Sequence, residues 1–418
     1  MISTPRSRCP FGAIFARFIH GRDRNCEERR TQLIDFAQLA LQVEFATIPV
    51  YLTGMYSIAD RSCAAYQTLR SVVMEEMFHA NLAANLVVAL GGRPRFTDDA
   101  APVYPGYLPH ANEATTPRIG LFRASAEVFN KVYAAIESPA PGGAPAQDDR
   151  YDSIAQLYGA LREAIDAYPG NPFEVSPGKC RGRQRTDIYL GKFGGQVVEV
   201  TDKASALHAI KQIVEQGEGI VPGGEKPLVP VEPFGAYNHY GPRTDGTYGP
   251  IIGTPEEMSH FMKFRQIAFA TTTFPETLPI LSDPSLDQFS NPDARQLAEA
   301  FNRAYSLMLV NFERSFSNEG DPYFGIVLQL MHRVLPGLAV SLMNTPAHAG
   351  GDASVGPNAA PTWTYLPMER KEEDCGECIE GLERLLSGGA PETPSAQALA
   401  HALDAWRHLA APPLTSAT

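Results

Sequence analysis

The stretch Glu76-Met-Phe-His79 decides the fold, because the same Glu-x-x-His spacing returns at Glu257-Met-Ser-His260. Each copy follows a Gln-x-Glu segment, Gln42-Val-Glu44 in the first half and Gln216-Gly-Glu218 in the second. A Glu on one helix and a Glu-x-x-His on its neighbour make half of a two-metal carboxylate site, and two halves make the whole site. The repeat therefore predicts a metal-binding helical bundle.

The first half has the pattern that such a site needs. Residues three apart project from the same face of a helix, so Glu76 and His79 point together, beside the apolar Val72. Glu44 is the one charged residue of the stretch 39–46, whose other residues are all uncharged. Buried carboxylates and imidazoles without partners are costly. A divalent metal removes that cost by binding both in their deprotonated forms.

The second copy lies on a predicted helix over 254–273, with Thr254 as the N-cap and Pro255 at the first helical position. Glu257 and His260 would share an apolar face with Phe264. An alternative stays open, because Glu257 could also be the Glu of a capping box that reaches back to the N-cap amide.

The partner of the second copy is also open between two carboxylates. Glu218 matches Glu44 through the shared Gln-x-Glu spacing, and we prefer it. Glu215 fits a regular helix better, because Gly217 and Gly219 flank its rival.

These motifs predict a particular centre and chemistry. Carboxylates with two imidazoles suit iron or manganese, so we expect two iron ions, with manganese as the alternative metal. Such a site can reduce dioxygen where coordination positions stay open, and the expected partners are dioxygen and a small organic substrate. The candidate ligands are Glu44, Glu76, His79, Glu218, Glu257 and His260.

Helical periodicity predicts an all-α chain organised around one bundle with long loop insertions. Helices are expected over 28–58, 66–90, 121–137, 154–167, 203–218, 254–273, 293–316 and 323–343. The expected domains are a basic N-terminal arm (1–27), the bundle (28–345) with insertions at about 93–117, 138–150, 168–200 and 220–253, and a C-terminal helical extension (346–418).

Composition restricts the partners. The 418 residues carry a formal net charge of −12, which argues against nucleic acid or an anionic membrane as the main partner. The most apolar stretch, 326–343, contains Gln329 and Arg333, so we expect a core helix and no membrane span. The sequence leaves self-association into a homo-oligomer open.

Two features indicate a cytoplasmic protein. Arg17, His20 and Arg22 interrupt the apolar residues after Phe11, which is unlike a secretory signal. Only two of the six cysteines are close, Cys375 and Cys378, and a four-cysteine zinc site would need a second pair. We expect free thiols, with a redox role for this pair as the alternative.

In these stretches the sequence resembles the ferritin-like domain of the iminophenyl-pyruvate dimer synthases of violacein and indolocarbazole biosynthesis. The matching stretches are Leu41–Leu52, Glu76–Leu86, Ile136–Pro139, Glu215–Gly219 and Glu257–Phe261. The resemblance implies a ferritin-like four-helix bundle, with metal positions on Glu44, Glu76, His79, Glu257 and His260. Because those synthases are much longer than this chain, the resemblance implies the domain and not the dimerising reaction.

Three hypotheses follow for function. The first is an O2-dependent di-iron oxidase or oxygenase that acts on a small metabolite. The second is a ferroxidase or metal-storage-like protein without organic chemistry. The third is a bundle in which hydrogen bonds alone satisfy the Glu–His pairs.

Overall fold

The computed structural model describes residues 26–139, 150–174, 182–188, 195–218, 239–242, 256–367 and 400. Nearly all of the basic arm, the Cys375–Cys378 pair and the expected C-terminal helices lie outside the described residues. The side chains of 239–242 and of Glu256 and Glu257 are also not described.

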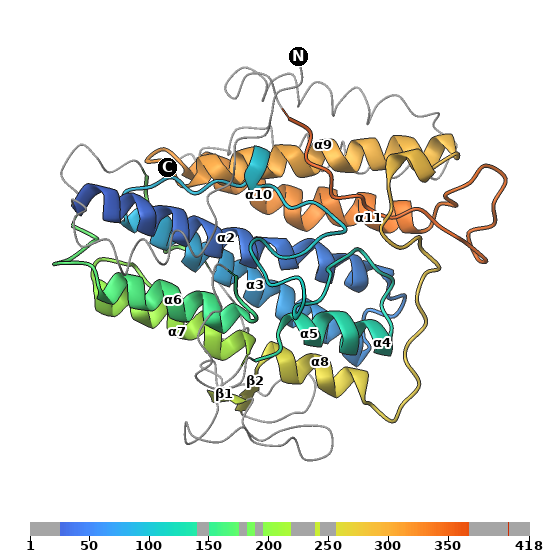
Figure 1. Ribbon diagram of the computed structural model, residues 1–418. Helices are drawn as coiled ribbons and strands as arrows, with labels where there is room; N and C mark the ends of the chain where they lie inside the picture. Colours follow the sequence, from blue (N-terminus) through green and yellow to red (C-terminus); the bar gives the residue numbers. More distant parts are fainter. Residues whose placement is uncertain are drawn as a thin grey trace, which may run out of the picture.

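Two long helices, α2 (Cys26–Ser57) and α3 (Ala64–Ala89), form the central hairpin of the molecule (Figure 1). From Phe36 onward nearly every residue of α2 is buried, which explains why its sequence is apolar on all sides. Helix α3 ends at Ala89, and Gly91 just beyond it has a φ of 88°, the left-handed conformation that glycine adopts without steric cost. Both helices agree with the predicted ranges to within two residues.

Two pairs of shorter helices cover one face of this hairpin, and Figure 1 shows them one after the other along its length. The first pair is α6 with α7, and the second is the broken helix α4–η2–α5 with α8. Helices α2 and α3 are thus the two continuous helices of the bundle. Each of the other two helical positions is divided between two shorter helices that follow one another along the hairpin. The bounds are α4 (Ala126–Val128), the π-helical η2 (Phe129–Tyr133), α5 (Ala134–Ile136), α6 (Ile154–Asp166), α7 (Lys203–Gly217) and α8 (His260–Ala268).

Helices α9 to α11 cover the opposite face of the hairpin (Figure 1). Their bounds are α9 (Pro292–Ser315), α10 (Asp321–Gln329), the π-helical η4 (Leu330–Val334) and α11 (Leu335–Met343). By length and composition alone, Cys26–Ser57 and Asp321–Met343 could each cross a membrane. The most apolar window of the first is 83% buried inside the protein, and that of the second is 44% buried.

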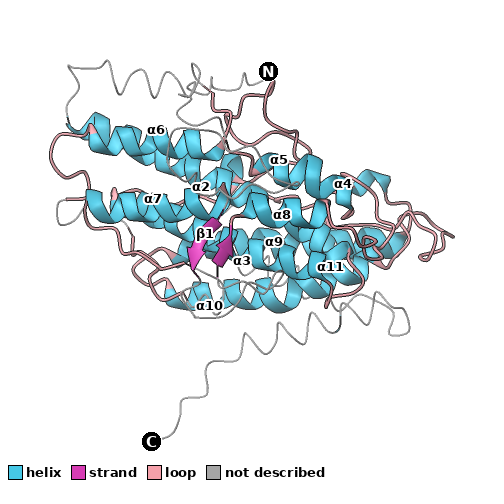
Figure 2. Cartoon of the chain, turned by 90° about the horizontal axis from the view of Figure 1, so that it is seen from below, coloured by secondary structure: helices cyan, strands magenta, loops and turns pink. Residues whose placement is uncertain are grey.

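The helical prediction needs two corrections, although Figure 2 confirms that the described chain is predominantly helical. The helix predicted from Thr254 begins only at His260, with Ser259 as its N-cap, because residues 256–258 pair as a strand. The helix predicted from residue 121 begins at Ala126, where Ser125 caps it. The strands are β1 (His239–Pro242) and β2 (Glu256–Met258), and two single 3-10 turns are η1 (Asp98–Ala100) and η3 (Leu286–Gln288).

Candidate metal centre

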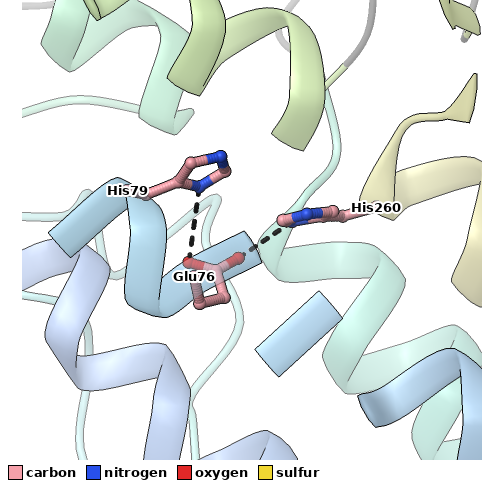
Figure 3. A group of neighbouring side chains, drawn as sticks. All are labelled: Glu76, His79 and His260. Atoms are coloured by element: carbon pink, nitrogen blue, oxygen red, sulfur yellow. Dashed lines mark ion pairs between the residues drawn. The ribbon is translucent and has the colours of Figure 1, made fainter. Parts of the chain in front are cut away.

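The carboxylate of Glu76 lies between two imidazoles (Figure 3). Its Oε1 is 2.9 Å from Nδ1 of His260, and its Oε2 is 3.7 Å from Nδ1 of His79. Ligand atoms of the three residues all lie within 4.8 Å of one another. One carboxylate therefore faces both histidines of the predicted set, and each through a different oxygen.

Two further carboxylates flank this group, one beside each imidazole. Glu44 on α2 places Oε2 3.4 Å from Nδ1 of His79. Glu137, the residue after α5, places Oε1 3.8 Å from Nδ1 of His260. All five side chains are at most 2% exposed. We call Glu44, Glu76, His79, Glu137 and His260 the carboxylate cluster.

The outer nitrogen of each imidazole has its own partner. Nε2 of His79 is 2.8 Å from the amide oxygen of Gln216, and Nε2 of His260 is 3.0 Å from Oε2 of Glu75. Because both partners are acceptors, the proton of a neutral ring lies on Nε2. The lone pair of each ring then lies on Nδ1, which is the nitrogen that faces the carboxylates. This is how protein imidazoles are oriented as metal ligands.

Glu75 is fully buried and carries a second buried contact. Its Oε2 is 2.5 Å from the ammonium of Lys263, which also donates to Ser71 Oγ at 3.1 Å. Burial raises the pKa of Glu75, but the charge of Lys263 and the hydrogen bond with His260 outweigh it, and the pKa falls to about 2. Glu75 and Glu76 are both buried, so these adjacent carboxylates do not form a solvated acidic turn.

The groups of the carboxylate cluster shift one another's pKa values. Burial raises the pKa of Glu44 to about 7. Burial lowers the pKa of His79, but hydrogen bonds and charges from Glu44 and Glu76 outweigh it and bring the pKa to about 9. The pKa of Glu76 falls despite burial, because the two imidazoles beside its carboxylate favour the ionised form. A site that gathers protons in this way can exchange them for a cation.

The donor atoms fit a divalent metal. Glu44 Oε1, Glu76 Oε2 and His260 Nδ1 are buried and have no hydrogen-bond partner among the described residues. Unpaired buried polar atoms are rare in folded proteins and point to a missing ligand. Three carboxylates and two imidazoles are also the donor set that iron and manganese accept.

Tyrosines lie beside both outer carboxylates of the cluster. The hydroxyl of Tyr51 donates to Glu137 Oε1 at 2.6 Å, and the phenol of Tyr158 lies beside Glu44. The rings of Tyr51, Tyr133 and Phe264 pack within 5.4 Å of one another, centroid to centroid. The hydrogen bond from Tyr51 holds the carboxylate of Glu137 in place.

The structure brings four of the six predicted ligands together, namely Glu44, Glu76, His79 and His260. Glu218 is buried, but its Oε1 accepts from the Ala155 amide at 2.7 Å and its Oε2 from Ser153 Oγ at 3.4 Å, at the start of α6. Its role as a ligand stays a prediction. The rival Glu215 is partly exposed beside Lys211. Glu257 lies on β2, and its side chain is outside the described residues.

Three residues of the site were not predicted from the sequence, namely Glu75, Glu137 and Gln216. Glu137 was visible only within the matching stretch Ile136–Pro139, at the end of a helix. Gln216 is the first residue of the second Gln-x-Glu segment. The repeated segment therefore contains a residue of the site. Its Gln, and not its Glu, contacts the histidine.

A separate apolar cavity of about 110 Å³ lies on the side of the hairpin that faces α9 and α10. Phe45 and Met77 line it from α2 and α3, Met308 from α9 and Phe324 from α10. No carboxylate of the cluster is among its lining residues. The cavity therefore does not open onto the cluster within the described part of the chain.

Comparison with known families agrees with this geometry. A family model described as Ferritin-like matches residues 37–269, which is more than half of the chain. A crystal structure of a ferritin-like protein from Caulobacter vibrioides superimposes with a TM-score of 0.52 at 24% identity. That match covers 80% of this chain and 97% of the other, and it shows the fold.

Two curated proteins are similar in sequence. The 2-imino-3-(indol-3-yl)propanoate dimerase of Chromobacterium violaceum is 26% identical over 83% of this chain. The dichlorochromopyrrolate synthase of Lentzea aerocolonigenes is 27% identical over 49% of this chain. The matches cover 35% of the first protein and 20% of the second, so this chain spans only part of each relative's length.

Proposed function

This chain belongs to the ferritin-like family, and on that premise we propose that its carboxylate cluster binds two iron ions for O2-dependent oxidation of a small organic metabolite. The observation that carries the proposal is the placement of Glu76 between two imidazoles that both face it with Nδ1. A single carboxylate with one oxygen toward each histidine is suited to two metals that share a ligand.

Each metal position has its own pair of ligands in this proposal. Glu44 and His79 would hold one ion, Glu137 and His260 would hold the other, and Glu76 would be shared. When bound, a di-iron(II) centre supplies the electrons that reduce dioxygen. The protein supplies a dry, fixed site, because every ligand side chain is at most 2% exposed.

The residues around the ligands orient them. Tyr51 donates to Glu137, which restricts the rotation of that carboxylate. Gln216 and Glu75 accept from the outer nitrogens of the two imidazoles and thereby keep Nδ1 of each ring pointed inward. Enzymes that work on reactive centres need this preorganisation, because the ligands then do not have to reorient when the metal changes charge.

The names of the relatives support only a general substrate class. The Chromobacterium violaceum protein is named for an indole-bearing imino acid, which is a small oxidisable molecule. We extend to this chain only the oxidation of a small organic metabolite. Dimerisation is not extended, because the match covers 35% of that protein's length.

Metal analysis is the direct test of the proposal. Protein produced with iron should hold about two metal ions per chain, and Glu76→Ala should lose most of both, because it removes the shared ligand. Addition of iron(II) without oxygen, followed by air, should produce an oxygen-dependent absorbance. Folded protein without metal would contradict the proposal. A His79→Ala variant with lower stability and unchanged metal content would favour a purely structural cluster.

A ferroxidase or storage-like protein is the second candidate. The observation in its favour is the apolar cavity, which lies away from the carboxylate cluster. A storage-like protein should continue to oxidise and retain iron well beyond two ions per chain. An oxidase of organic substrates should stop at the occupancy of its centre, so titration with excess iron(II) in air separates the two.

A further inference from the structure

We propose that the two metal positions are unequal, and that the position of His260 binds metal more tightly than that of His79. The reason lies in the acceptors behind the two rings, a buried carboxylate for His260 and a neutral amide for His79. The inference rests on the proposed metal-binding function and makes Glu75, Lys263 and Gln216 positioning residues.

The two acceptors differ in chemistry although their geometry is similar. The Nε2 to acceptor distance is 3.0 Å for His260 with Glu75 and 2.8 Å for His79 with Gln216. A carboxylate that accepts from the outer N–H raises the electron density on the inner nitrogen more than an amide does. Replacement of such an outer partner costs about 10–100-fold in metal affinity.

Lys263 keeps the carboxylate of Glu75 anionic in a buried place. Its ammonium is 1% exposed, 2.5 Å from Glu75 Oε2, and lies on α8 one turn after His260. A buried carboxylate without a cation would carry a large desolvation cost. Glu75 can therefore accept a hydrogen bond from His260 Nε2 while Lys263 balances its negative charge.

The same contacts also fix His260 more firmly than His79. His260 and Lys263 both lie on α8 and both contact Glu75 on α3, so two bonds join these helices behind the ligand. On its outer side, His79 contacts the amide oxygen of Gln216 on α7. On the inner side, Nδ1 to Glu76 is 2.9 Å for His260 and 3.7 Å for His79. A ligand that is already in place loses less entropy when metal binds.

Anaerobic titration of the metal-free 418-residue chain with cobalt(II) tests the proposal, with visible absorption bands as the readout. We expect two steps that differ by about tenfold or more, beyond the statistical factor for two equal sites. Glu75→Gln should weaken the tight step about 10–100-fold and leave the weak step nearly unchanged. The matched variant Gln216→Glu should raise the cobalt(II) affinity of the weaker step. The difference in affinity between the two steps should then become smaller.

Ligand variants assign the steps to the residues. His260→Gln should remove the tight step and keep the weak one, and His79→Gln should do the reverse. Equal affinities in the unaltered protein, or loss of the tight step in His79→Gln alone, would overturn the inference. This holds even if Glu75→Gln fails to fold. No cobalt binding at all would instead overturn the proposed metal function, so the two failures can be told apart.

Discussion

His79 carries a proton that a metal would replace, so the pH dependence of stability reports on the state of the centre. Its pKa in the metal-free protein is about 9, against an ordinary value of 6.5. A raised pKa contributes stability that is fully present below pH 6.5 and is lost as the pH rises through 9. We expect metal-free protein to lose on the order of 3 kcal/mol across this window.

Urea denaturation at both ends of the window measures this loss, with iron(II)-loaded protein under nitrogen as the comparison. Loaded protein should not lose stability as the pH rises, because metal takes the place of the proton and binds better to deprotonated ligands. The same fall with and without metal would mean that metal does not displace the proton of His79.

At this scale the sequence predicts ligands that stand out from their neighbours. Glu44 was found because it is alone in an uncharged helix, and it is indeed buried beside His79. Glu75 could not be placed, because its cation, Lys263, is 188 positions away in the chain. Glu137 ends a helix that contains a π-helical turn, so a helical period of 3.6 residues does not give its direction.

At the scale of elements, the packing of α2 against the π-helical turn η2 depends on one glycine. A Cβ added at Gly54 would overlap the hydroxyl oxygen of Tyr133 and stand 3.1 Å from its ring carbon Cζ. Alanine is the better helix former by about 1 kcal/mol, but overpacking of this kind costs about 1–3 kcal/mol. We expect Gly54→Ala to lower the free energy of unfolding.

Gly54→Ala with Tyr133→Phe is the matched variant, because phenylalanine lacks the overlapping hydroxyl. Urea denaturation should show that the double variant recovers part of the loss. The two changes should therefore be non-additive, as is usual for residues in contact. Additive losses would show that Tyr133 is not the group that Gly54 accommodates.

The errors in the predicted elements have local causes. Thr254-Pro255 is typical of a helix start, but the adjacent residues 256–258 pair with β1 and delay the helix to His260. Tertiary pairing overrides a capping signal in that case. As a result, Glu257 and His260 are not on one helix, and the second Glu-x-x-His is not a structural copy of the first.

Across the whole molecule, the hairpin α2–α3 lies between the carboxylate cluster and the side chains that surround Trp363. Glu44 and Thr53 are nine positions apart on α2, which places them on opposite sides of that helix. Glu44 faces the carboxylate cluster, and Thr53 accepts from the indole N–H of Trp363 at 2.9 Å. The sequence predicted the central hairpin well, because a long apolar helical run is a local signal. It did not predict how residues 344–367 return to α2, because they contain no such run.

Trp363 should therefore stabilise the fold without affecting metal content. It is 2% exposed and packs edge-on against Phe301 and Tyr305 on α9, with centroids 4.8 and 5.2 Å away. Trp363→Ala should cost about 3–5 kcal/mol in thermal or urea unfolding. Trp363→Phe should cost less, because it keeps an aromatic ring and loses the hydrogen bond to Thr53. Metal per folded chain should stay at the unaltered value in both, in contrast to Glu76→Ala. A loss of metal in Trp363→Ala as large as in Glu76→Ala would show that the two sides of the hairpin are coupled.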